Sequence, residues 1–321
     1  MKKNFVFVID RKSSISYNLL SGAFDRKNVV SFYHTLKCGK GLFIKILNKV
    51  ARIRDKYVRV SKKVCKQDYK DKIVVFTNES LNKMPTDALL KIKKEAKATV
   101  LFFIDETFND YESIRNAKSF LERREEFFDL VYSFSEKDAK NCGFLWNMAY
   151  YPKFCVKENR AVSDVFFVGN VKDRKQFLTD LAETLKNKGN TFNFYVDGIK
   201  DMPAPLGWHF HRISYRESVN KASASNVILD IADKRQTGMT LRYFEAVCYN
   251  KKLLTNNANV KNMPYYDERY MKIYNGVEDI AKIEKEWFTS SEDIDYGYKG
   301  EFEPKYFLER IEKDLTEKNR A

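Results

Sequence analysis

The stretch that most constrains the fold of this chain runs from Val227 to Val247. Its first residues, Val227 to Ile231, are largely apolar and β-branched, which predicts a buried strand. A polar loop, Ala232 to Gly238, comes next, and Thr240 stands where the N-cap of a helix belongs. Apolar residues then recur at helical spacing, at Leu241, Phe244, Val247 and Cys248. With a return to strand at Lys252 to Thr255, the stretch predicts a strand, loop, helix, strand unit.

The predicted loop ends at a helix N-terminus, where backbone N–H groups favour a bound phosphate. Arg242 and Glu245 lie one turn apart at the start of that helix. An arginine suits a phosphate and a carboxylate suits ribose hydroxyls, so the pair suits a sugar nucleotide. An ordinary βαβ unit with a capped helix explains the same pattern, and the loop alone leaves both interpretations open.

Composition sets the limits on the class of protein. The chain has 321 residues, 44% of them hydrophobic and 32% charged, which is typical of a globular protein of two domains. It contains no apolar run near the ~18 residues that a membrane span needs. Its five cysteines are scattered, which indicates neither a zinc site nor a disulfide framework and predicts a cytoplasmic location. The net charge of +14 calls for an anionic partner: nucleic acid, membrane or an acidic small molecule.

Part of that charge is concentrated between residues 37 and 72, where lysine and arginine dominate. Apolar residues recur there every three or four positions, from Phe43 to Tyr57, which predicts an amphipathic helix with a basic face. Such a helix either packs on the sheet with its outer face in solvent or lies against anionic lipid headgroups. The residues expected on the basic face are Lys45, Lys49, Arg52, Lys56 and Arg59.

Strands and helices alternate along the rest of the chain, which predicts parallel sheets covered by helices. Three local features are also expected: a loop from Asn78 to Ser80, a short helix from a Ser135 cap through Ala139 with its stop at Asn141 to Gly143, and a packed loop rather than a metal site at Trp208, His209 and His211.

Ligands of such parallel sheets bind at the carboxyl ends of strands. Acidic and amide residues fall at these ends in the first half, and each also serves as an ordinary cap or loop residue: Asp10, Asn78, Glu79, Asp105 and Glu106. An irregular segment from Tyr150 to Val162 predicts the linker. In the second half, Gly169 ends a strand and Arg174 begins a helix, which makes a second candidate anion site.

Two further stretches are distinctive when they are read with the first: Tyr132-Ser-Phe-Ser-Glu-Lys-Asp-Ala-Lys and Asp164-Val-Phe-Phe-Val-Gly169. The most distinctive part of the first stretch is the run from Gln236 to Ala246, with Lys251-Lys-Leu-Leu-Thr-Asn-Asn257 after it. In this order the chain resembles bacterial CgeB-like and lipopolysaccharide-core glycosyltransferases from about residue 72 to about residue 257. The resemblance implies the α/β fold called GT-B, two facing Rossmann-like domains with parallel sheets and a C-terminal helix.

The resemblance also implies a separate role for each domain. Residues 1–155 would form the acceptor-side domain, 156–300 the donor-binding domain, and 301–321 a helix that packs back on the first domain. Within the tail, Tyr306, Phe307, Ile311 and Leu315 are expected on the apolar side. Such enzymes transfer sugar from a nucleotide-sugar donor and usually bind no metal or other cofactor. Glu245 resembles the glutamate that holds the donor ribose, but Thr237 stands where many relatives have a second glutamate.

The residue roles follow from this chemistry. Negative charge develops on the leaving diphosphate. Without a metal, cationic side chains and helix N-terminal amides must stabilise this charge. The residues expected to do so, or to hold the donor, are Gly169, Arg174, Gln236, Thr237, Gly238, Thr240, Arg242 and Glu245. Asp10 and Asp105 are the candidates for the general base that activates the acceptor hydroxyl.

The acceptor expected from the resemblance is a bacterial cell-surface glycan or a lipid-linked precursor, reached from the inner face of the cell membrane. Two other classes of function stay open. A catalytically silent GT-B scaffold could serve as a partner-binding protein, because fold does not fix function. A basic nucleic-acid-binding protein is the third, although the aromatic residues fall mostly inside expected strands and no nucleic-acid motif is present, so we expect no nucleic-acid partner.

Overall fold

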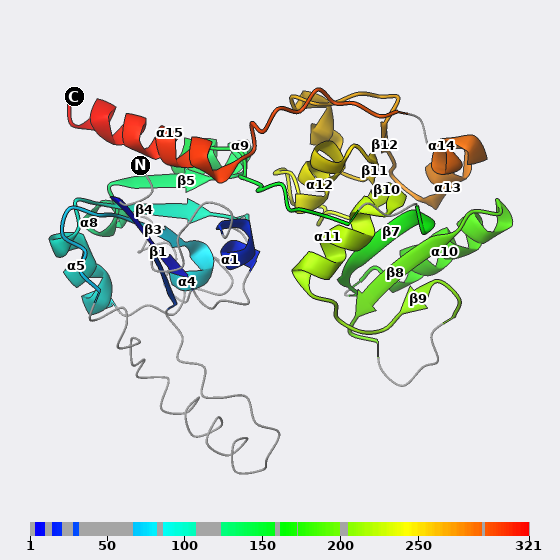
Figure 1. Ribbon diagram of the computed structural model, residues 1–321, viewed down its shortest axis with the longest axis horizontal. Coiled ribbons are helices and arrows are strands. Elements are labelled where there is room, and N and C mark those ends of the chain that lie inside the picture. Colours follow the sequence, from blue (N-terminus) through cyan, green and yellow to red (C-terminus); the bar gives the residue numbers. More distant parts are fainter. Residues whose placement is uncertain are drawn as a thin grey trace, which may run out of the picture. The chain divides into compact units, whose positions relative to one another are not determined.

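A computed structural model describes residues 4–9, 15–20, 28–31, 67–81, 86–106, 123–157, 161–171, 173–199, 205–290 and 293–320. The chain divides into two compact units (Figure 1). Unit 1 comprises Met1–Pro152 and Glu303–Ala321, and unit 2 comprises Lys153–Phe302. No helix among the described residues is long and apolar enough to cross a membrane. The predicted basic helix and Asp10 lie outside the described residues.

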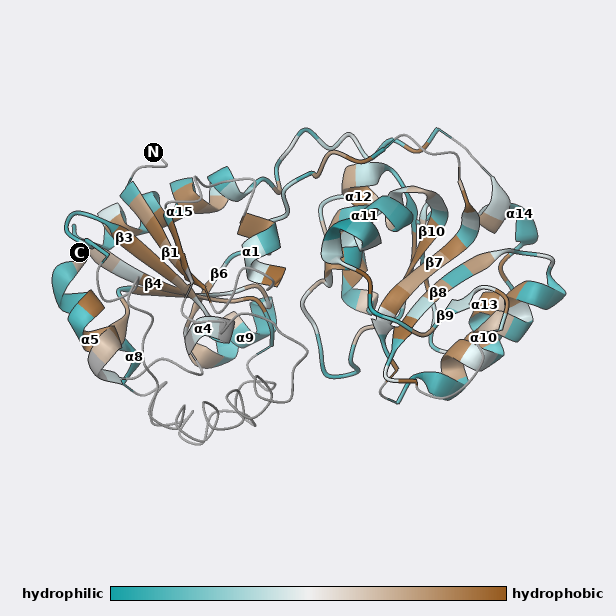
Figure 2. Cartoon of the chain, turned by 60° about the horizontal axis from the view of Figure 1, so that its bottom comes forward, coloured by the Kyte–Doolittle hydropathy of each residue, from teal (hydrophilic) through white to brown (hydrophobic). Residues whose placement is uncertain are grey.

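Unit 1 is built on a parallel sheet with the strand order β2-β1-β3-β4-β5-β6 in its described part. The first four strands in chain order are apolar, which suits the interior of a parallel sheet. In Figure 2 the inner strands of both units stand out as strongly hydrophobic among the described residues. The strands are β1 (Phe5–Ile9), β2 (Val29–Ser31), β3 (Ile73–Thr77), β4 (Ala98–Phe103), β5 (Leu130–Ser133) and β6 (Leu145–Trp146).

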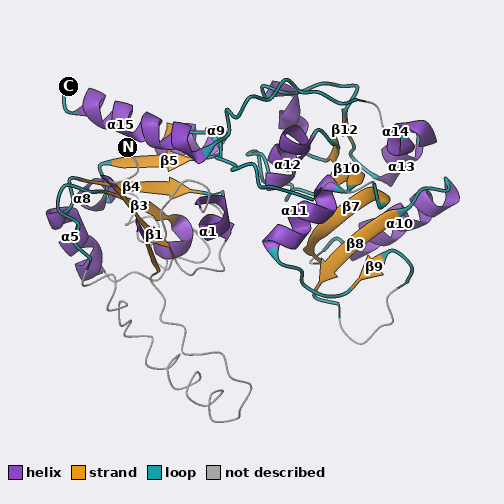
Figure 3. Cartoon of the chain, in the orientation of Figure 1, coloured by secondary structure: helices purple, strands orange, loops and turns teal. Residues whose placement is uncertain are grey.

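Helices connect these strands, as Figure 3 shows. They are α1 (Ile15–Leu20), α4 (Asn78–Leu81), α5 (Thr86–Glu95), α8 (Arg124–Phe127) and α9 (Glu136–Cys142). Helix α9 begins at the predicted cap, where the Ser135 hydroxyl accepts a hydrogen bond from Asp138 N. It continues past the predicted Ala139 to Cys142, and Gly143 closes it at φ 64°. The expected loop from Asn78 to Ser80 is wrong, because α4 begins directly where β3 ends.

The C-terminal helix α15 (Pro304–Lys318) belongs to unit 1 and packs on β5. Phe307 packs against the rings of Phe102 and Tyr132, at centroid distances of 4.7 and 5.3 Å. The Tyr132 hydroxyl donates to Asp314 Oδ2 at 2.9 Å, which ties the helix to the strand. Tyr306, expected on the apolar side, is 44% exposed. Leu308 is buried in its place, because it shares a face with Ile311 and Leu315, which follow it at helical spacing.

Unit 2 is also built on a parallel sheet, with the strand order β12-β11-β10-β7-β8-β9 in its described part. Its strands are β7 (Ser163–Asn170), β8 (Phe192–Asp197), β9 (Trp208–His209), β10 (Ser225–Asp230), β11 (Lys252–Thr255) and β12 (Met271–Ile273). Its helices are α10 (Lys175–Asn187), α11 (Tyr215–Ser223), α12 (Leu241–Tyr249), the 3-10 helix η3 (Ala258–Asn262), α13 (Val277–Ala281) and α14 (Lys285–Thr289).

The predicted strand, loop, helix, strand unit is confirmed as β10, α12 and β11. The packed loop expected at Trp208 and His209 is wrong, because these residues form the edge strand β9. Two parallel sheets covered by helices confirm the predicted α/β class. Within unit 2, the parallel order brings the carboxyl ends of β7, β10 and β11 to one edge of the sheet.

Candidate functional site

The carboxyl edge of the unit 2 sheet gathers buried polar residues around Asp230. Asp230 is the last residue of β10 and pairs in register with Thr255, the last residue of β11. Its carboxylate accepts hydrogen bonds from Thr240 Oγ1 and Thr255 Oγ1, each at 2.8 Å. Burial raises the pKa of Asp230 above its ordinary value, although both hydroxyls and the charges of Arg242 and Arg174 oppose the rise. The carboxyl group therefore joins the end of β11 to the start of α12.

The loop between β10 and α12 is held by asparagine side chains from the end of β11. Asn256 accepts from Ala232 N at 2.7 Å and donates to Ala232 O at 3.0 Å. Asn257 Nδ2 donates to Gly238 O, and Asn259 Nδ2 donates to Thr237 O, each at 3.1 Å. These bonds engage loop carbonyls and fix the backbone that leads into the N-terminus of α12. The conformation of this loop is thus set before any ligand arrives.

Four of the predicted residues lie in this loop and at the start of its helix: Gln236, Thr237, Gly238 and Thr240. Gln236 is half-buried, and its Nε2 donates to Gly238 O at 3.1 Å. Thr240 is the N-cap of α12, as predicted, and its hydroxyl accepts from Arg242 N at 3.2 Å. Because the same hydroxyl donates to Asp230, one side chain fixes both the strand end and the helix start. A helix N-terminus held in this way carries a partial positive charge that favours an anion.

Arg242 and Glu245 form an ion pair inside unit 2. Arg242 Nη1 donates to Glu245 Oε2, and the Tyr215 hydroxyl lies 3.5 Å from Glu245 Oε1. The Glu245 side chain is 0% exposed, whereas that of Arg242 is 16% exposed. Burial raises the pKa of Glu245 and outweighs the opposing charge of Arg242. Arg242 is therefore the member of the pair that a ligand can touch directly, and the Glu245 carboxylate is engaged within the protein.

Arg174 lies close enough to this cluster for its charge to act on it. It is the N-cap residue of α10, and it lowers the pKa of both Asp230 and Tyr274 against the larger effect of burial. The Tyr274 hydroxyl donates to Asp230 O at 2.9 Å, which adds a further tie at the end of β10. The edge therefore places two arginines, Arg174 and Arg242, around one buried carboxyl group.

Gly169, near the end of β7, has a steric explanation inside the protein. A Cβ at this position would lie 2.8 Å from Phe167 Cζ, because the two residues share a face of the strand. A side chain at position 169 would therefore force the buried Phe167 ring to shift. This steric effect is independent of the anion site that the sequence suggests at the same position.

Of the two candidate general bases, the structure describes Asp105. It is exposed and follows β4 in unit 1, next to Glu106, which is buried. Asn78, at the end of the neighbouring strand β3, accepts from Ile104 N at 3.0 Å, so the ends of β3 and β4 are joined. The structure thus places Asp105 in unit 1 and the other eight predicted site residues in unit 2.

Sequence reasoning missed the residues that hold this edge together: Asp230, Thr255, Asn256, Asn257, Asn259, Tyr215 and Tyr274. A signal was present for some of them, because Thr255 ends a predicted strand and Asn256 and Asn257 directly follow it. Tyr274 and Tyr215 had none, because only the fold brings them to this edge. Within the described residues, no group of three or more His, Cys, Asp or Glu side chains could hold a metal ion.

Comparison with solved structures identifies the fold. The chain is similar to T4 phage BGT in complex with its substrate UDP-glucose, with a TM-score of 0.50, 15% identity and 98% of each chain covered. It is also similar to OtsA without ligand, with a TM-score of 0.56, 11% identity, and coverage of 97% of this chain and 99% of that one. An α-glucosyltransferase in complex with UDP-glucose and DNA containing an abasic site gives 0.56, 8% identity, and 97% and 98% coverage. The chain therefore has the GT-B fold.

No protein-family model and no curated protein sequence matches the chain. At these sequence identities, similarity to the solved structures establishes the fold alone. Any inference about activity must come from the residues of the candidate site. The resemblance to the CgeB-like and lipopolysaccharide-core type accordingly stays a prediction.

Proposed function

We propose that this chain is a glycosyltransferase that binds a nucleotide-sugar donor at the carboxyl edge of the unit 2 sheet. The observation that carries the proposal is the loop from Ala232 to Thr240, fixed by asparagine side chains and ending at the capped N-terminus of α12 beside Arg174 and Arg242. Amide groups of a helix N-terminus and two guanidinium groups suit a diphosphate. Similar solved structures hold UDP-glucose, which supports the same ligand class here.

The proposed reaction breaks the bond between the anomeric carbon and the diphosphate. Positive charge builds on the sugar and negative charge on the leaving group, so preorganised cations accelerate the step. Arg174 and Arg242 would stabilise the departing diphosphate without a metal, and Glu245 would hold the ribose. Because Glu245 is fully buried against Arg242, this last role requires the donor to draw Arg242 toward the phosphates and uncover the carboxylate. Asp105 or Asp10 would take the proton of the acceptor hydroxyl.

For the acceptor, we propose a bacterial cell-surface glycan or its lipid-linked precursor, met by a cytoplasmic enzyme at the inner face of the membrane. The basic residues between 37 and 72 support an anionic surface as the meeting place. One similar structure holds DNA, so the GT-B fold itself is compatible with a nucleic-acid acceptor as well. DNA therefore belongs among the acceptors that the assay must include.

A catalytically silent scaffold is the second candidate, and the burial of Glu245 favours it. A carboxylate that only neutralises Arg242 would stabilise unit 2 without touching a donor. Thr237, in the place of a second glutamate, points the same way. The two candidates differ in whether labelled sugar ever leaves the donor.

The test incubates purified protein with labelled UDP-, GDP-, CMP- and ADP-sugars and a membrane extract or DNA, with and without chelator. We expect one donor to label a glycan or lipid in the extract, with chelator making no difference. If Arg174 stabilises negative charge that develops on the diphosphate in the transition state, Arg174→Ala should lower kcat by a larger factor than it raises KM. Donor binding without any transfer would favour the scaffold, labelling of DNA would change the acceptor, and loss of activity with chelator would contradict the metal-free mechanism.

A further inference from the structure

Tyr215 links helix α11 to the buried ion pair of the candidate donor site. It is the first residue of α11, and its hydroxyl lies 3.5 Å from Glu245 Oε1, whereas Arg242 Nη1 donates to the other carboxylate oxygen, Oε2. One turn further along α11, the Ser218 hydroxyl accepts from Arg242 Nη1 at 3.5 Å. Helix α11 therefore faces both members of the ion pair, and each carboxylate oxygen is served by a different helix.

The charged form of Glu245 depends on Arg242 and Tyr215, because the Glu245 side chain is 0% exposed. Burial raises the pKa of Glu245; Arg242 and the Tyr215 hydroxyl oppose the rise, and the nearby charge of Asp230 adds to it. Without Arg242, the Tyr215 hydroxyl is the one of these groups that still favours the carboxylate. A buried carboxylate without a hydrogen-bond donor is costly, so the hydroxyl becomes more important when Arg242 moves away.

Phe154 packs on Tyr215 from the segment by which the chain enters unit 2 at Lys153. The rings of Phe154 and Tyr215 meet edge to face, with their centroids 5.7 Å apart. The hydroxyl of Tyr249, the last residue of α12, accepts from Phe154 N at 2.9 Å and donates to Phe154 O at 3.2 Å. The Arg216 guanidinium lies 5.9 Å from the centre of the Phe154 ring. Because α11 and α12 both hold Phe154, the Tyr215 ring has a fixed surface to pack on.

We propose that Tyr215 is a positioning residue for the nucleotide-sugar donor, which holds the Glu245 carboxylate in place once the diphosphate has drawn Arg242 away. The inference rests on the proposed function, in which the ribose reaches Glu245 only after Arg242 turns toward the phosphates. The Tyr215 hydroxyl then donates to Oε1, and Oε2 is open to a ribose hydroxyl. Phe154 keeps the Tyr215 ring where its hydroxyl reaches the carboxylate.

The test measures donor affinity by calorimetry, and the probe is whichever of UDP-, GDP-, CMP- and ADP-glucose binds the wild type most tightly. Tyr215→Phe should weaken this probe about tenfold at pH 8, the loss expected for a hydrogen bond to a charged group. Tyr243→Phe is the matched control, because it also removes a tyrosine hydroxyl next to α12. That hydroxyl accepts from Tyr265 N at 3.3 Å, so its loss should leave the affinity unchanged.

The pH dependence separates a positioning role from a purely structural one. The groups that face Glu245 are Arg242 on its own helix, Tyr215 on α11 and Asp230 on β10. Arg242 stays charged at every pH of the test, and Asp230 titrates in wild type and variant alike, so the ratio of their affinities reports on Glu245. Because a protonated carboxyl group no longer needs the Tyr215 hydroxyl, the penalty of Tyr215→Phe should shrink between pH 8 and pH 5.

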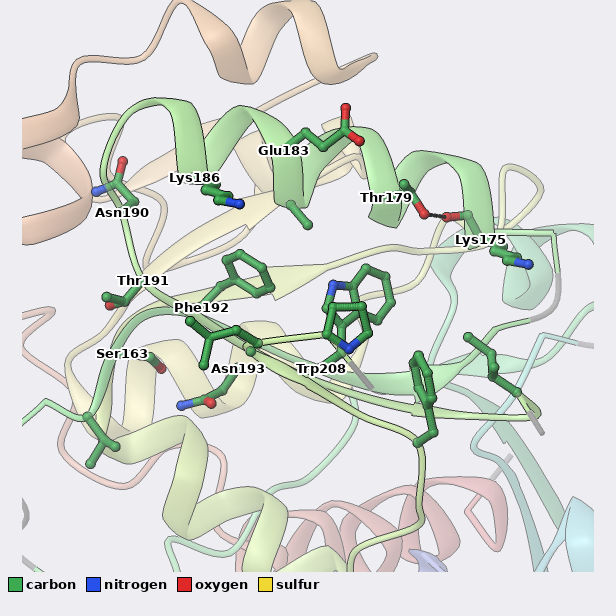
Figure 4. Close-up of a pocket in the computed structure, with 17 residues that line it drawn as sticks. Ser163, Lys175, Thr179, Glu183, Lys186, Asn190, Thr191, Phe192, Asn193 and Trp208 are labelled. Carbon is green, nitrogen blue, oxygen red and sulfur yellow. Dashed lines mark hydrogen bonds between the residues drawn. The ribbon is translucent and has the colours of Figure 1, made fainter. Parts of the chain in front are cut away.

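A pocket elsewhere in unit 2 provides a check on where the probe binds. It has a volume of about 710 Å³ and lies along α10 and the start of β8 (Figure 4). Its lining includes none of Phe154, Tyr215, Arg242 and Glu245. A sugar nucleotide held in that pocket would therefore bind wild type and variants with the same affinity.

Phe154→Ala tests the second part of the proposal and should weaken the probe by a smaller factor than Tyr215→Phe. In a protein that already carries Tyr215→Phe it should add little, because the hydroxyl that Phe154 positions is gone. If none of the four probes binds the wild type, the proposed function fails and the inference fails with it. If a probe binds but Tyr215→Phe has the affinity of Tyr243→Phe, or is weakened by the same factor at pH 8 and pH 5, the role of Tyr215 is overturned while the donor site stands.

Discussion

Replacing Thr240 by valine removes one hydroxyl group from two hydrogen bonds at the candidate donor site. The hydroxyl accepts from Arg242 N at 3.2 Å and donates to Asp230 at 2.8 Å. Loss of an N-cap costs about 1 kcal/mol. Leaving a buried carboxyl group with one hydroxyl donor in place of two costs about 1–3 kcal/mol. We therefore expect Thr240→Val to lower the free energy of unfolding of unit 2 by about 2–4 kcal/mol.

The assay is urea denaturation followed by tryptophan fluorescence in a Trp146→Phe background. Trp146 lies in unit 1, whereas Trp208 and Trp287 lie in unit 2, so the remaining signal reports on unit 2 alone. This choice matters because a chain of two units need not unfold in one step. The dependence of the free energy on urea should stay the same as in the parent, so that a shift of the midpoint measures stability.

Two control variants divide the expected loss into its parts. Ser214→Ala removes the N-cap of α11, where Ser214 Oγ accepts from Glu217 N at 3.2 Å, and should cost only about 1 kcal/mol. Thr255→Val removes the other hydroxyl donor to Asp230 and should cost about 1–3 kcal/mol. If Thr240→Val costs no more than Ser214→Ala, the hydroxyl does not serve Asp230 as described, and the reasoning fails.

Three further predictions follow from the same structure and from the basic segment. Asp230→Asn should change how stability depends on pH. Because burial raises the pKa of Asp230 above 3.8 in the folded protein, its contribution to the free energy of unfolding is greatest below pH 3.8 and is lost as the pH rises through the folded pKa. The urea midpoint of the wild type should therefore exceed that of Asp230→Asn by a larger margin at pH 4 than at pH 7. Glu245→Ala should weaken donor binding by ~1–3 kcal/mol in calorimetry, and unchanged affinity in a folded variant would refute the ribose role. Sedimentation with vesicles should favour anionic over neutral lipid at low salt and lose this preference when alanines replace the basic residues, which lie outside the described part: Lys45, Lys49, Arg52, Lys56 and Arg59.

The sequence was sufficient to predict the local elements that carry strong periodicity. The strand from Val227, the Thr240 cap and the helix from Leu241 all follow from patterns within a few residues. The edge strand β9 has only two residues, too few for any period, and it was taken for a loop. Helix α4 was missed because it is one turn long and begins with Asn78, a residue common in loops.

The candidate site could be predicted in part. The sequence placed Arg242 and Glu245 one turn apart on α12 and gave each a separate role toward the donor. Their ion pair and their burial could not be foreseen, because these depend on Tyr215 and Ser218 of α11. The sequence likewise offered Gly169 as a place where a ligand could approach. Only the structure shows that a side chain there would force the Phe167 ring to shift. The burial of a side chain and the space around a glycine depend on contacts between segments that are distant in the sequence. Local sequence patterns do not contain this information.

The central claim is that the carboxyl edge of the unit 2 sheet is the donor site, and hydrogen–deuterium exchange tests it most directly. The measurement compares the free protein with the protein saturated by whichever nucleotide sugar binds in calorimetry. We expect slower exchange in peptides covering residues 231–243, which include the loop and the N-terminus of α12. Exchange should be unchanged in peptides covering residues 205–210, which include the start of the edge strand β9. Saturating donor that leaves residues 231–243 unprotected, or protects only residues elsewhere, would contradict the account.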